Sequence, residues 1–425
     1  MKVFLLYPPY KGHVEEEKKG LFPPLGLAYI AAVLRSQGYS VRIIDMNVEI
    51  KSLQELEKIC EKEKPDIIGV SSTTITYNTC VNILKHVKTF LPSAIRVVGG
   101  PHASIMPHEF LDYSDFVVYG EGEYTMLELI KTLENNGDPS TIKGLIFKGN
   151  KEVIKTDIRP LINDLDNLPL PARYLLPMEA YNDNKGAILT SRGCPFNCIF
   201  CNSHLIFGKK FRARSPKNVV DEIEYLIKAY NVQVIRILDD MFTLNRKRVL
   251  EICDEILNRG LNIGWELTNG TRVDKVDKEL LEKMHEAGCY RIYYGIESGS
   301  EKVLKLLRKD IKLDQVRRVV KWTKEIGIEV GGFFMIGGPG ETMETLKETE
   351  NFIDELDLDY VHLSIATPYP RTDFWNWVLK NGRFVTDDYS KFEKEFIFET
   401  PDFPWEQRMK IFEYLHEKYC SERDK

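Results

Sequence analysis

The stretch Ser191-Arg-Gly-Cys-Pro-Phe-Asn-Cys-Ile-Phe-Cys201 decides how this chain is organised. It places Cys194, Cys198 and Cys201 in one short loop with the spacing C-x3-C-x2-C, directly after the apolar, strand-like run Gly186–Thr190. Closely spaced thiolates suit a soft metal centre such as zinc, copper(I) or an iron–sulfur cluster. Three ligands with no obvious fourth favour a redox cluster in which one iron stays open for chemistry.

Two other interpretations of the loop are open. A structural zinc site has four nitrogen or sulfur ligands, and His204 could supply the fourth, but zinc ligands usually come as two separated pairs and no second pair is present. A disulfide fits less well, because three cysteines in one loop cannot pair off and the chain has no secretory features. The redox cluster is therefore the leading prediction.

The composition is that of an ordinary soluble globular protein. The 425 residues, 43% hydrophobic and 29% charged, are enough for two or three domains of about 100–200 residues each. A net charge of -6 argues against nucleic acid as a partner, and no apolar run reaches the roughly 18 residues that predict a membrane span. The N-terminus resembles a first strand rather than a signal peptide, so we expect a cytoplasmic protein.

Strand and helix patterns alternate through residues 1–135. The strand-like runs lie at 3–7, 41–45, 67–71, 96–98 and 116–119, and the helical patterns at 25–37, 53–62 and 81–90. This alternation predicts an α/β domain with a doubly wound parallel sheet, in which ligands lie beyond the carboxyl ends of the strands. No G-x-G-x-x-G follows the first strand, so a nicotinamide or flavin dinucleotide is not expected.

The strand ends of this domain carry residues that let a large ligand approach the backbone. They are Pro8 and Pro9, then Ser71, Ser72, Thr73 and Thr74, then Gly99, Gly100, Pro101 and His102, and finally Gly120, Glu121, Gly122 and Glu123. Ordinary tight turns would show a similar composition, so these positions alone do not identify a ligand.

The second half of the chain predicts a barrel. Residues 136–180 form the expected linker, with a hairpin at 144–155, and from 181 to 372 six strand–helix units follow. Six such units predict a partial (β/α)6 barrel with its active site at the carboxyl ends of the strands. We expect a short C-terminal helical extension at 373–425, with an amphipathic helix at 405–419.

Four features of this half resemble the radical SAM superfamily over residues 186–370. They are the cysteine loop, Asp239 and the runs Gly295–Ser300 and Phe334–Glu341. The resemblance implies a [4Fe-4S] cluster held by the three cysteines of the loop, whose open iron chelates the methionyl amine and carboxylate of S-adenosylmethionine. A carboxylate at a strand end, taken singly, is as often a helix cap.

The same resemblance implies further contacts with S-adenosylmethionine, while it identifies no residue that takes part in the chemistry. The contacts are Phe200 near the adenine, Asp239 near the methionyl amine, Glu297 and Ser298 near the ribose, and the backbone of Gly337, Gly338 and Pro339 near the adenosyl group. The glycines would give the ligand close access to the backbone.

The runs Pro23–Tyr29, Val98–His102 and Tyr119–Glu123 resemble the cobalamin-binding domain that precedes the catalytic domain in one large class of radical SAM enzymes. The resemblance implies cobalamin at the strand ends named above, with Tyr77 and His102 as candidate neighbours of the corrin. Many other cobalamin proteins donate a histidine to cobalt from a D-x-H-x-x-G motif. The run Asp45–Ile50 has no such histidine, so cobalamin is expected without a histidine ligand.

The two cofactors together imply a cobalamin-dependent radical SAM methyltransferase. In this family a 5′-deoxyadenosyl radical abstracts hydrogen from an unactivated carbon, which then takes a methyl group from methylcobalamin. The substrate is a small molecule or a peptide or protein side chain. The reducing electron comes from an external donor such as flavodoxin or ferredoxin.

Two alternatives stay open. One is a non-methylating rearrangement or cyclisation with the same cofactors, and the other is a non-enzymatic corrinoid-binding sensor, which would not need the cysteine loop. A methylthio-transferase acting on nucleic acid is disfavoured, because its N-terminal domain should carry three more cluster cysteines and only Cys60 and Cys80 lie there.

Overall fold

The computed structural model describes residues 1–10, 21–50 and 52–420. They group into two compact units. The first comprises Met1–Lys185 with Leu205–Gly208, and the second comprises Gly186–His204 with Lys209–Lys425.

The first unit is built on a seven-stranded sheet with the order β2-β1-β3-β4-β5-β6-β7. Its strands are β1 (Lys2–Tyr7), β2 (Ser40–Asp45), β3 (Ile67–Ser71), β4 (Ile95–Gly99), β5 (Phe116–Val118), β6 (Leu145–Lys148) and β7 (Val153–Lys155). Strands β1 to β5 pair in parallel, whereas β6 and β7 are antiparallel. The predicted doubly wound sheet is confirmed, and its strand order reverses between β1 and β3, where ligands bind in such folds.

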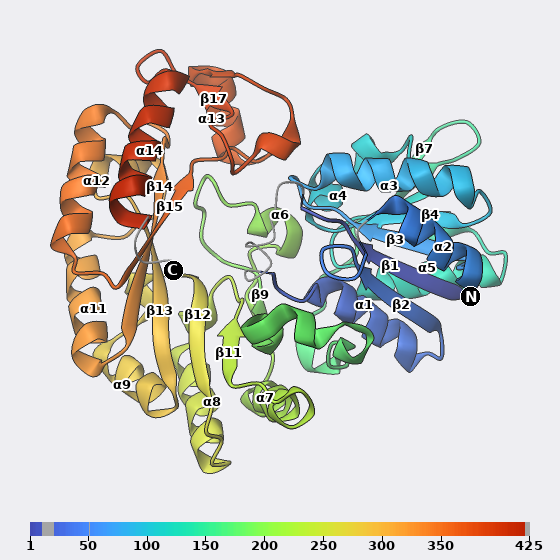
Figure 1. The fold of residues 1–425 in the computed structure, drawn as a ribbon, viewed down its shortest axis with the longest axis horizontal. Helices are drawn as coiled ribbons and strands as arrows, with labels where there is room; N and C mark the ends of the chain where they lie inside the picture. The colour runs from blue at the N-terminus through green and yellow to red at the C-terminus, as the bar shows by residue number, and fades with distance from the viewer. Residues whose placement is uncertain (11–20, 51, 421–425) are drawn as a thin grey trace. The chain divides into compact units, whose positions relative to one another are not determined.

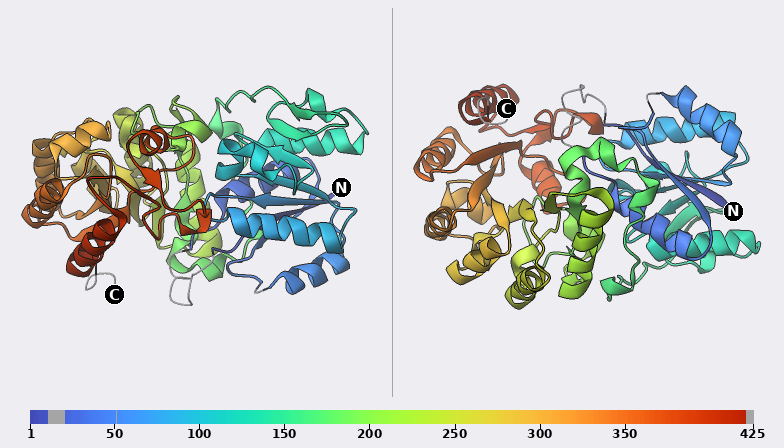
Figure 2. Two further views of the ribbon diagram at one scale, coloured as in Figure 1. Left: turned by 90° about the horizontal axis from the view of Figure 1, so that it is seen from above. Right: turned by 60° about the horizontal axis from the view of Figure 1, so that its bottom comes forward.

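Helices pack against both faces of this sheet (Figures 1 and 2). They are α1 (Leu25–Ser36), α2 (Leu53–Glu63), α3 (Tyr77–Phe90), α4 (Pro101–Ile105) and α5 (Glu123–Glu134). Helix α1 contacts α5, and α2 contacts α3. The core between the sheet and the second pair includes Phe4, Ile68 and Val98 from the strands and Leu56 and Leu84 from the helices. Burial of these apolar side chains stabilises the layer.

The expected hairpin is present, but it belongs to the first unit. Strand β6 pairs with β5, so β6 and β7 extend the sheet instead of forming a linker. Residues beyond the hairpin are also tied to this unit: the Tyr181 hydroxyl donates a 2.8 Å hydrogen bond to Asp45, and both side chains are buried. The first unit therefore runs to Lys185, further than the boundaries expected at 135 and 180.

The second unit contains a six-stranded parallel sheet with the order β15-β14-β13-β12-β11-β8. Its strands are β8 (Ala187–Ile188), β11 (Val234–Ile237), β12 (Gly264–Thr271), β13 (Cys289–Glu297), β14 (Glu329–Ile336) and β15 (Tyr360–Ile365). Successive strands are neighbours, as in a barrel, and β8 and β15 form the edges. This is the predicted partial (β/α)6 barrel.

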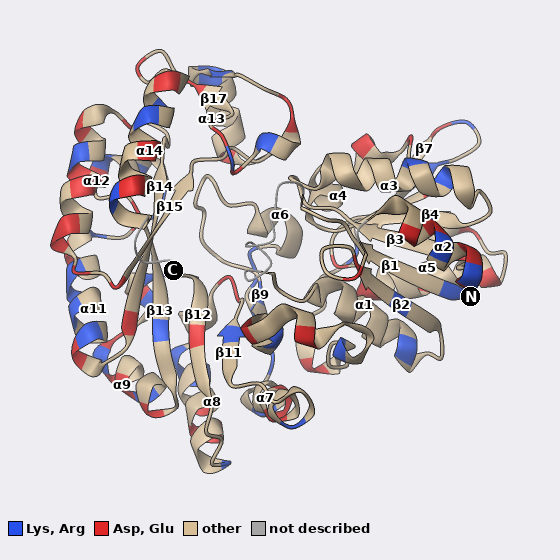
Figure 3. Ribbon diagram, viewed as in Figure 1, with Lys and Arg blue, Asp and Glu red and all other residues tan. Residues whose placement is uncertain are grey.

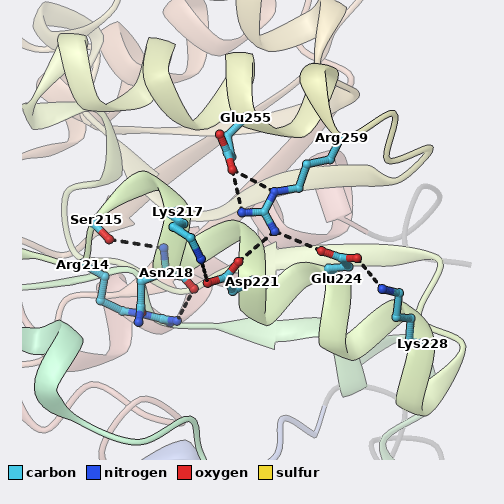
Figure 4. A network of polar contacts seen from close by, with 9 residues as sticks. All are labelled: Arg214, Ser215, Lys217, Asn218, Asp221, Glu224, Lys228, Glu255 and Arg259. Carbon is cyan, nitrogen blue, oxygen red and sulfur yellow. Dashed lines mark hydrogen bonds and ion pairs between the residues drawn. The ribbon is translucent and has the colours of Figure 1, made fainter.

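The outer helices follow the strands in turn. They are α7 (Pro216–Tyr230), α8 (Arg246–Asn258), α9 (Lys278–Glu286), α10 (Glu301–Leu306), α11 (Leu313–Ile326) and α12 (Met343–Glu355), with the short α6 (Ser203–Phe207) in the cysteine loop. Charges of both signs are interspersed along α11 and α12 (Figure 3). Figure 4 shows Arg259 between α7 and α8, where its guanidinium lies 2.8 Å from Asp221, 3.0 Å from Glu224 and 2.6 Å from Glu255.

The C-terminal segment is more than a helical extension. It contains α13 (Asp373–Asn381), a hairpin of β16 (Arg383–Phe384) and β17 (Phe398–Glu399), and α14 (Trp405–Cys420). Helix α14 contacts β15 and lies beside α12 (Figure 1), where Lys418 is 2.9 Å from Glu350. It therefore takes the place of the sixth outer helix of the barrel, although the sequence pattern placed it outside.

Candidate functional site

The cysteine loop leaves the barrel as an excursion that is closed at its base. Strand β9 (Ser191–Arg192) before the cysteines pairs antiparallel with β10 (Arg212–Ala213) after them. The three thiols are free and partly exposed. Among the described residues, no set of three or more His, Cys, Asp or Glu side chains is already placed to hold a single metal ion, and this includes the three cysteines and His204.

Burial raises the pKa values of the Cys194, Cys198 and Cys201 thiols, that of Cys201 to about 12. Without a metal the thiols are therefore protonated at neutral pH. Metal coordination requires the thiolates and releases the protons. Three free thiols on one loop form a donor set that fits an iron–sulfur cluster.

Two aspartates at the end of β11 brace this loop on both sides. The carboxylate of Asp239 accepts hydrogen bonds from the Thr190 amide at 2.6 Å and from the Thr190 and Ser191 hydroxyls at 2.5 Å each. Asp240 accepts a 2.6 Å hydrogen bond from the Ser203 hydroxyl, beyond the last cysteine. Asp239 was expected near the methionyl amine, and here both of its oxygens hold the segment that enters the loop.

Substituting Asp239 by alanine should destabilise the loop, because the amide and two hydroxyls that it bonds lie in a buried region. Losing an ionised acceptor costs about 2–4 kcal/mol in such a setting. We expect that loss in the free energy of unfolding, together with faster loss of iron to a chelator. Asp254→Ala on the exposed face of α8 is the matched control, at about 1 kcal/mol or less. Equal losses of unfolding free energy in Asp239→Ala and Asp254→Ala would contradict the role of Asp239 in holding the loop.

The turn after β13 brings Glu297 and Ser298 into two different settings. Glu297 has a positive φ of 69°, and its carboxylate accepts a 2.8 Å hydrogen bond from the Lys309 ammonium. Ser298 is completely buried, and its hydroxyl lies 3.1 Å from that of Thr349 on α12. Glu297 thus shares a buried ion pair, while Ser298 fastens the turn to the neighbouring helix.

The glycine turn after β14 is shaped from both sides. Gly337 has a φ of 86°, and a Cβ there would lie 2.2 Å from the Phe396 ring, so only glycine fits. The amides of Gly337 and Gly338 donate to the Glu341 carboxylate, and Arg408 on α14 donates to the Gly337 carbonyl. Pro339 is buried within this turn, whereas Phe200 is partly buried in the cysteine loop.

The pKa of Glu341 gives this turn a pH dependence. Burial raises the pKa from 4.5 to about 7, although the hydrogen bond from the Gly337 amide and the positive charge of Arg408 both act to lower it. A pKa raised in the folded state means that the stabilising contribution is complete below pH 4.5 and is lost as the pH rises to about 7. The shift corresponds to roughly 3 kcal/mol.

We therefore expect the unfolding free energy of the wild type, relative to Glu341→Gln, to fall by up to roughly 3 kcal/mol between about pH 5 and pH 8. Chemical denaturation at several pH values measures this difference. Glu344→Gln, on the exposed surface of α12, should follow the wild-type profile. A Glu341→Gln profile parallel to that of the wild type would contradict the assignment.

The strand ends predicted to receive cobalamin meet at the carboxyl edge of the first sheet. The turns after β3 and β4 are packed together: the Ser72 amide donates to Gly99 at 2.8 Å, and the His102 amide donates to Ser72 at 2.9 Å. A Cβ at Gly100 would lie 2.7 Å from the Ser71 hydroxyl. The β5 turn joins them, because the Gly120 amide donates to Ser104 at 3.0 Å. The missing side chain at Gly100 therefore lets the turns after β3 and β4 pack against each other.

His102 is completely buried, and both ring nitrogens lie at hydrogen-bond distance from partners, Nδ1 at 3.1 Å from Thr74 and Nε2 at 3.1 Å from Glu109. The ring of Tyr77 lies edge-on to it at 5.2 Å. After β2, Asp45 accepts from the Asn47 amide at 2.9 Å, where other cobalamin proteins carry the histidine motif. Cobalamin without a histidine ligand stays a prediction.

Three cations near the second unit's strand ends were not among the sequence candidates. They are Arg272, Lys309 and Arg408, which are 4%, 5% and 1% exposed. Their positions depend on contacts across the barrel, and no local motif marks them. The only sequence signal is that Arg272 lies in the polar run after the β12 pattern.

Comparisons with known proteins agree with this geometry. The chain matches the radical SAM superfamily over residues 188–353 and the B12 binding domain over residues 16–130. It is 38% identical to an uncharacterized methyltransferase of Pyrococcus horikoshii, over 92% of this chain and 86% of that one. It is 32% identical to an anaerobic magnesium-protoporphyrin IX monomethyl ester cyclase of Rubrivivax gelatinosus, over 88% of this chain and 69% of the cyclase.

Solved structures show the same fold. The radical S-adenosylmethionine methyltransferase TsrM of Kitasatospora setae, with tryptophan substrate and aza-SAM bound, is 20% identical with a TM-score of 0.77, covering 91% of this chain and 79% of that one. The cobalamin-dependent S-adenosylmethionine radical enzyme OxsB, with aqua-cobalamin and S-adenosylmethionine bound, is 22% identical with a TM-score of 0.74. The match covers 98% of this chain and 61% of the OxsB chain.

The fold and the site therefore define a cobalamin-dependent radical SAM enzyme, and the chain belongs to that family. It is an enzyme of the C-methyltransferase type whose cofactors are a [4Fe-4S] cluster, S-adenosylmethionine and cobalamin. Membership of this enzyme family sets aside the corrinoid sensor. No helix in the described part of the chain is long and apolar enough to cross a membrane.

Proposed function

We propose that this enzyme transfers a methyl group from cobalamin to an unactivated carbon, and that the carbon belongs to a peptide or protein side chain. The observation that carries the proposal is the combination of a braced three-cysteine loop in the second unit with a first unit of cobalamin-binding type, in a chain 38% identical to a methyltransferase. The tryptophan substrate of TsrM supports an amino acid side chain as the class to test first.

The chain's own residues hold and shape the site. Cys194, Cys198 and Cys201 would hold the cluster, and Asp239 keeps the entry to their loop in place. The turn at Gly337 has a backbone conformation that a larger residue could not adopt beside Phe396. When bound, the cluster and S-adenosylmethionine supply a 5′-deoxyadenosyl radical, and cobalamin supplies the methyl group. An external flavodoxin or ferredoxin is the proposed electron donor.

A second candidate function is cyclisation without methyl transfer. The specific observation in its favour is the 32% identity to the cyclase of Rubrivivax gelatinosus. Both reactions would use the same cofactors, so they differ in products and not in the residues that bind the cofactors.

Product analysis separates the two functions. The chain is reconstituted anaerobically with iron, sulfide and cobalamin, supplied with S-adenosylmethionine and reductant, and incubated with peptide and small-molecule substrate pools. Methylated peptide with 5′-deoxyadenosine and S-adenosylhomocysteine in equal amounts supports the proposal. A product of unchanged methyl content with 5′-deoxyadenosine alone supports the cyclase. Methylation confined to the small-molecule pool would reject the peptide substrate but keep the methyl transfer.

A further inference from the structure

Arg272 and Lys309 are two of the buried cations beside the cysteine loop, whose base also carries Arg192 and Arg212. Arg272 follows β12, and Lys309 follows α10, and they are 4% and 5% exposed. Buried charges are costly unless they are paired and hydrogen-bonded. Both cations are paired, Arg272 with Asp274 and Lys309 with Glu297.

Arg272 joins three segments of the second unit. Its guanidinium carbon lies 3.8 Å from the centre of the Phe196 ring, which belongs to the loop between Cys194 and Cys198. It donates hydrogen bonds to the Lys309 carbonyl at 2.7 Å and to Asp274 at 2.8 Å. A planar guanidinium can stack and form a fork of hydrogen bonds at the same time. Arg272 therefore fixes the cysteine loop to the strand ends.

Lys309 reaches the same region from the other side. Its ammonium donates a 2.8 Å hydrogen bond to Glu297, and its chain segment is bonded to the loop, because the Ile199 amide donates to the Leu307 carbonyl at 3.1 Å. The segment that carries Lys309 and the cysteine loop thus form one hydrogen-bonded unit.

Both cations are placed next to residues that adjoin the thiols. Arg272 stacks on Phe196, which lies between Cys194 and Cys198, and the segment of Lys309 is bonded to Ile199, which directly follows Cys198. Charges act strongly here because the surroundings are of low polarity.

We propose that Arg272 and Lys309 raise the reduction potential of the cluster by holding two buried positive charges beside the cysteine loop. The inference rests on the proposed function of the three cysteines. Adding one electron from an external reductant increases the negative charge of the cluster, and a neighbouring cation stabilises that state. Net charge and surroundings are among the factors that set the potentials of iron–sulfur clusters.

The test is a redox titration of the reconstituted chain followed by electron paramagnetic resonance of the reduced cluster. Arg272→Gln and Lys309→Met should each shift the midpoint potential to more negative values. We expect the ratio of reduced to oxidised cluster at a fixed potential to fall about tenfold, which is about 59 mV for one electron. Arg272→Lys keeps the charge and should keep the midpoint, while it loses iron to a chelator faster than the wild type does.

The matched control is Lys305→Met, which removes an exposed charge on α10, one turn before Lys309. Its midpoint should equal that of the wild type. If Arg272→Gln and Lys309→Met lose iron faster but keep the wild-type midpoint, the cations only anchor the loop and the inference is overturned. If the Arg272→Gln chain does not hold a cluster, the midpoint potential of the Lys309→Met chain tests the inference in the same way. A wild-type chain that binds no iron would instead reject the cysteine assignment, and the iron content shows this before any potential is measured.

Discussion

Replacing Cys198 with alanine should leave a folded chain that holds no [4Fe-4S] cluster and forms no 5′-deoxyadenosine. Cys198 lies in the middle of the loop, and a cluster bound by three thiolates cannot keep its geometry on two. Iron and sulfide should fall from about four of each per chain to below about one. Metal analysis, the visible absorption of the cluster and the quantity of 5′-deoxyadenosine measure the effect. Cys194→Ala and Cys201→Ala should behave in the same way.

The matched control for this prediction is Cys253→Ala. Cys253 is another thiol of the second unit, but it is buried in the hydrophobic core on α8, so its loss should leave the iron content unchanged. Cobalamin binding by the Cys198→Ala chain reports that the first unit is folded. A Cys198→Ala chain with the iron content of the wild type would exclude Cys198 as a ligand.

Replacing Arg408 with methionine should cause the largest loss of stability among the single substitutions considered. The side chain is 1% exposed; it donates to the carbonyls of Gly337 and Phe403 and to the Thr400 hydroxyl, and its guanidinium carbon lies 4.4 Å from the centre of the Phe398 ring. Burial lowers the pKa of Arg408 to about 10, so it carries its charge at neutral pH. The substitution leaves buried acceptors without their donor, at about 1–3 kcal/mol each, and removes the positive charge that acts on Glu341. We therefore expect a loss of about 3–5 kcal/mol in the free energy of unfolding.

The same substitution should weaken S-adenosylmethionine binding about tenfold, about 1.4 kcal/mol, because Arg408 holds the carbonyl of the glycine turn. Equilibrium dialysis with the reconstituted chain measures the affinity. Lys410→Met, an exposed position on the same helix, should change neither quantity. Arg408→Lys should recover only part of the stability and part of the affinity for S-adenosylmethionine, since an ammonium cannot reproduce the forked hydrogen bonds of the guanidinium.

A double variant separates the charge of Arg408 from its packing. At about pH 8 the Glu341 carboxyl is ionised, because its pKa is about 7, and Arg408→Met leaves that buried charge without compensation. Adding Glu341→Gln to Arg408→Met should therefore restore part of the stability at this pH. Additive losses would show that the two side chains act independently.

Asp239 illustrates how far residue-by-residue reasoning from the sequence could go. The pattern of an apolar strand followed by two aspartates predicted a carboxylate at the end of β11, and it lies there. Its partners were not predictable, because Thr190 and Ser191 precede it by almost fifty residues and meet it only when β8 and β11 pair. Its predicted contact with the methionyl amine stays a prediction.

Helix α14 shows the corresponding limit for the fold. Its amphipathic pattern predicted a helix at 405–419, close to the observed Trp405–Cys420. A hydrophobic face does not specify which surface will cover it, however. Only the folded chain places α14 against β15, and this position brings Arg408 to the glycine turn.

The amino-acid sequence was enough to predict the kind of cofactor loop and the two types of fold. The spacing C-x3-C-x2-C, the strand-end glycines and the alternation of strands and helices are local patterns, and local patterns are sufficient to predict a three-cysteine cluster loop and two α/β folds. Which groups surround that loop became evident only from the folded chain. Arg272, Lys309 and Arg408 act across the barrel, and their partners are set by the pairing of strands and the packing of helices. Contacts of this kind depend on distances between segments far apart in the chain, which no single stretch of sequence contains.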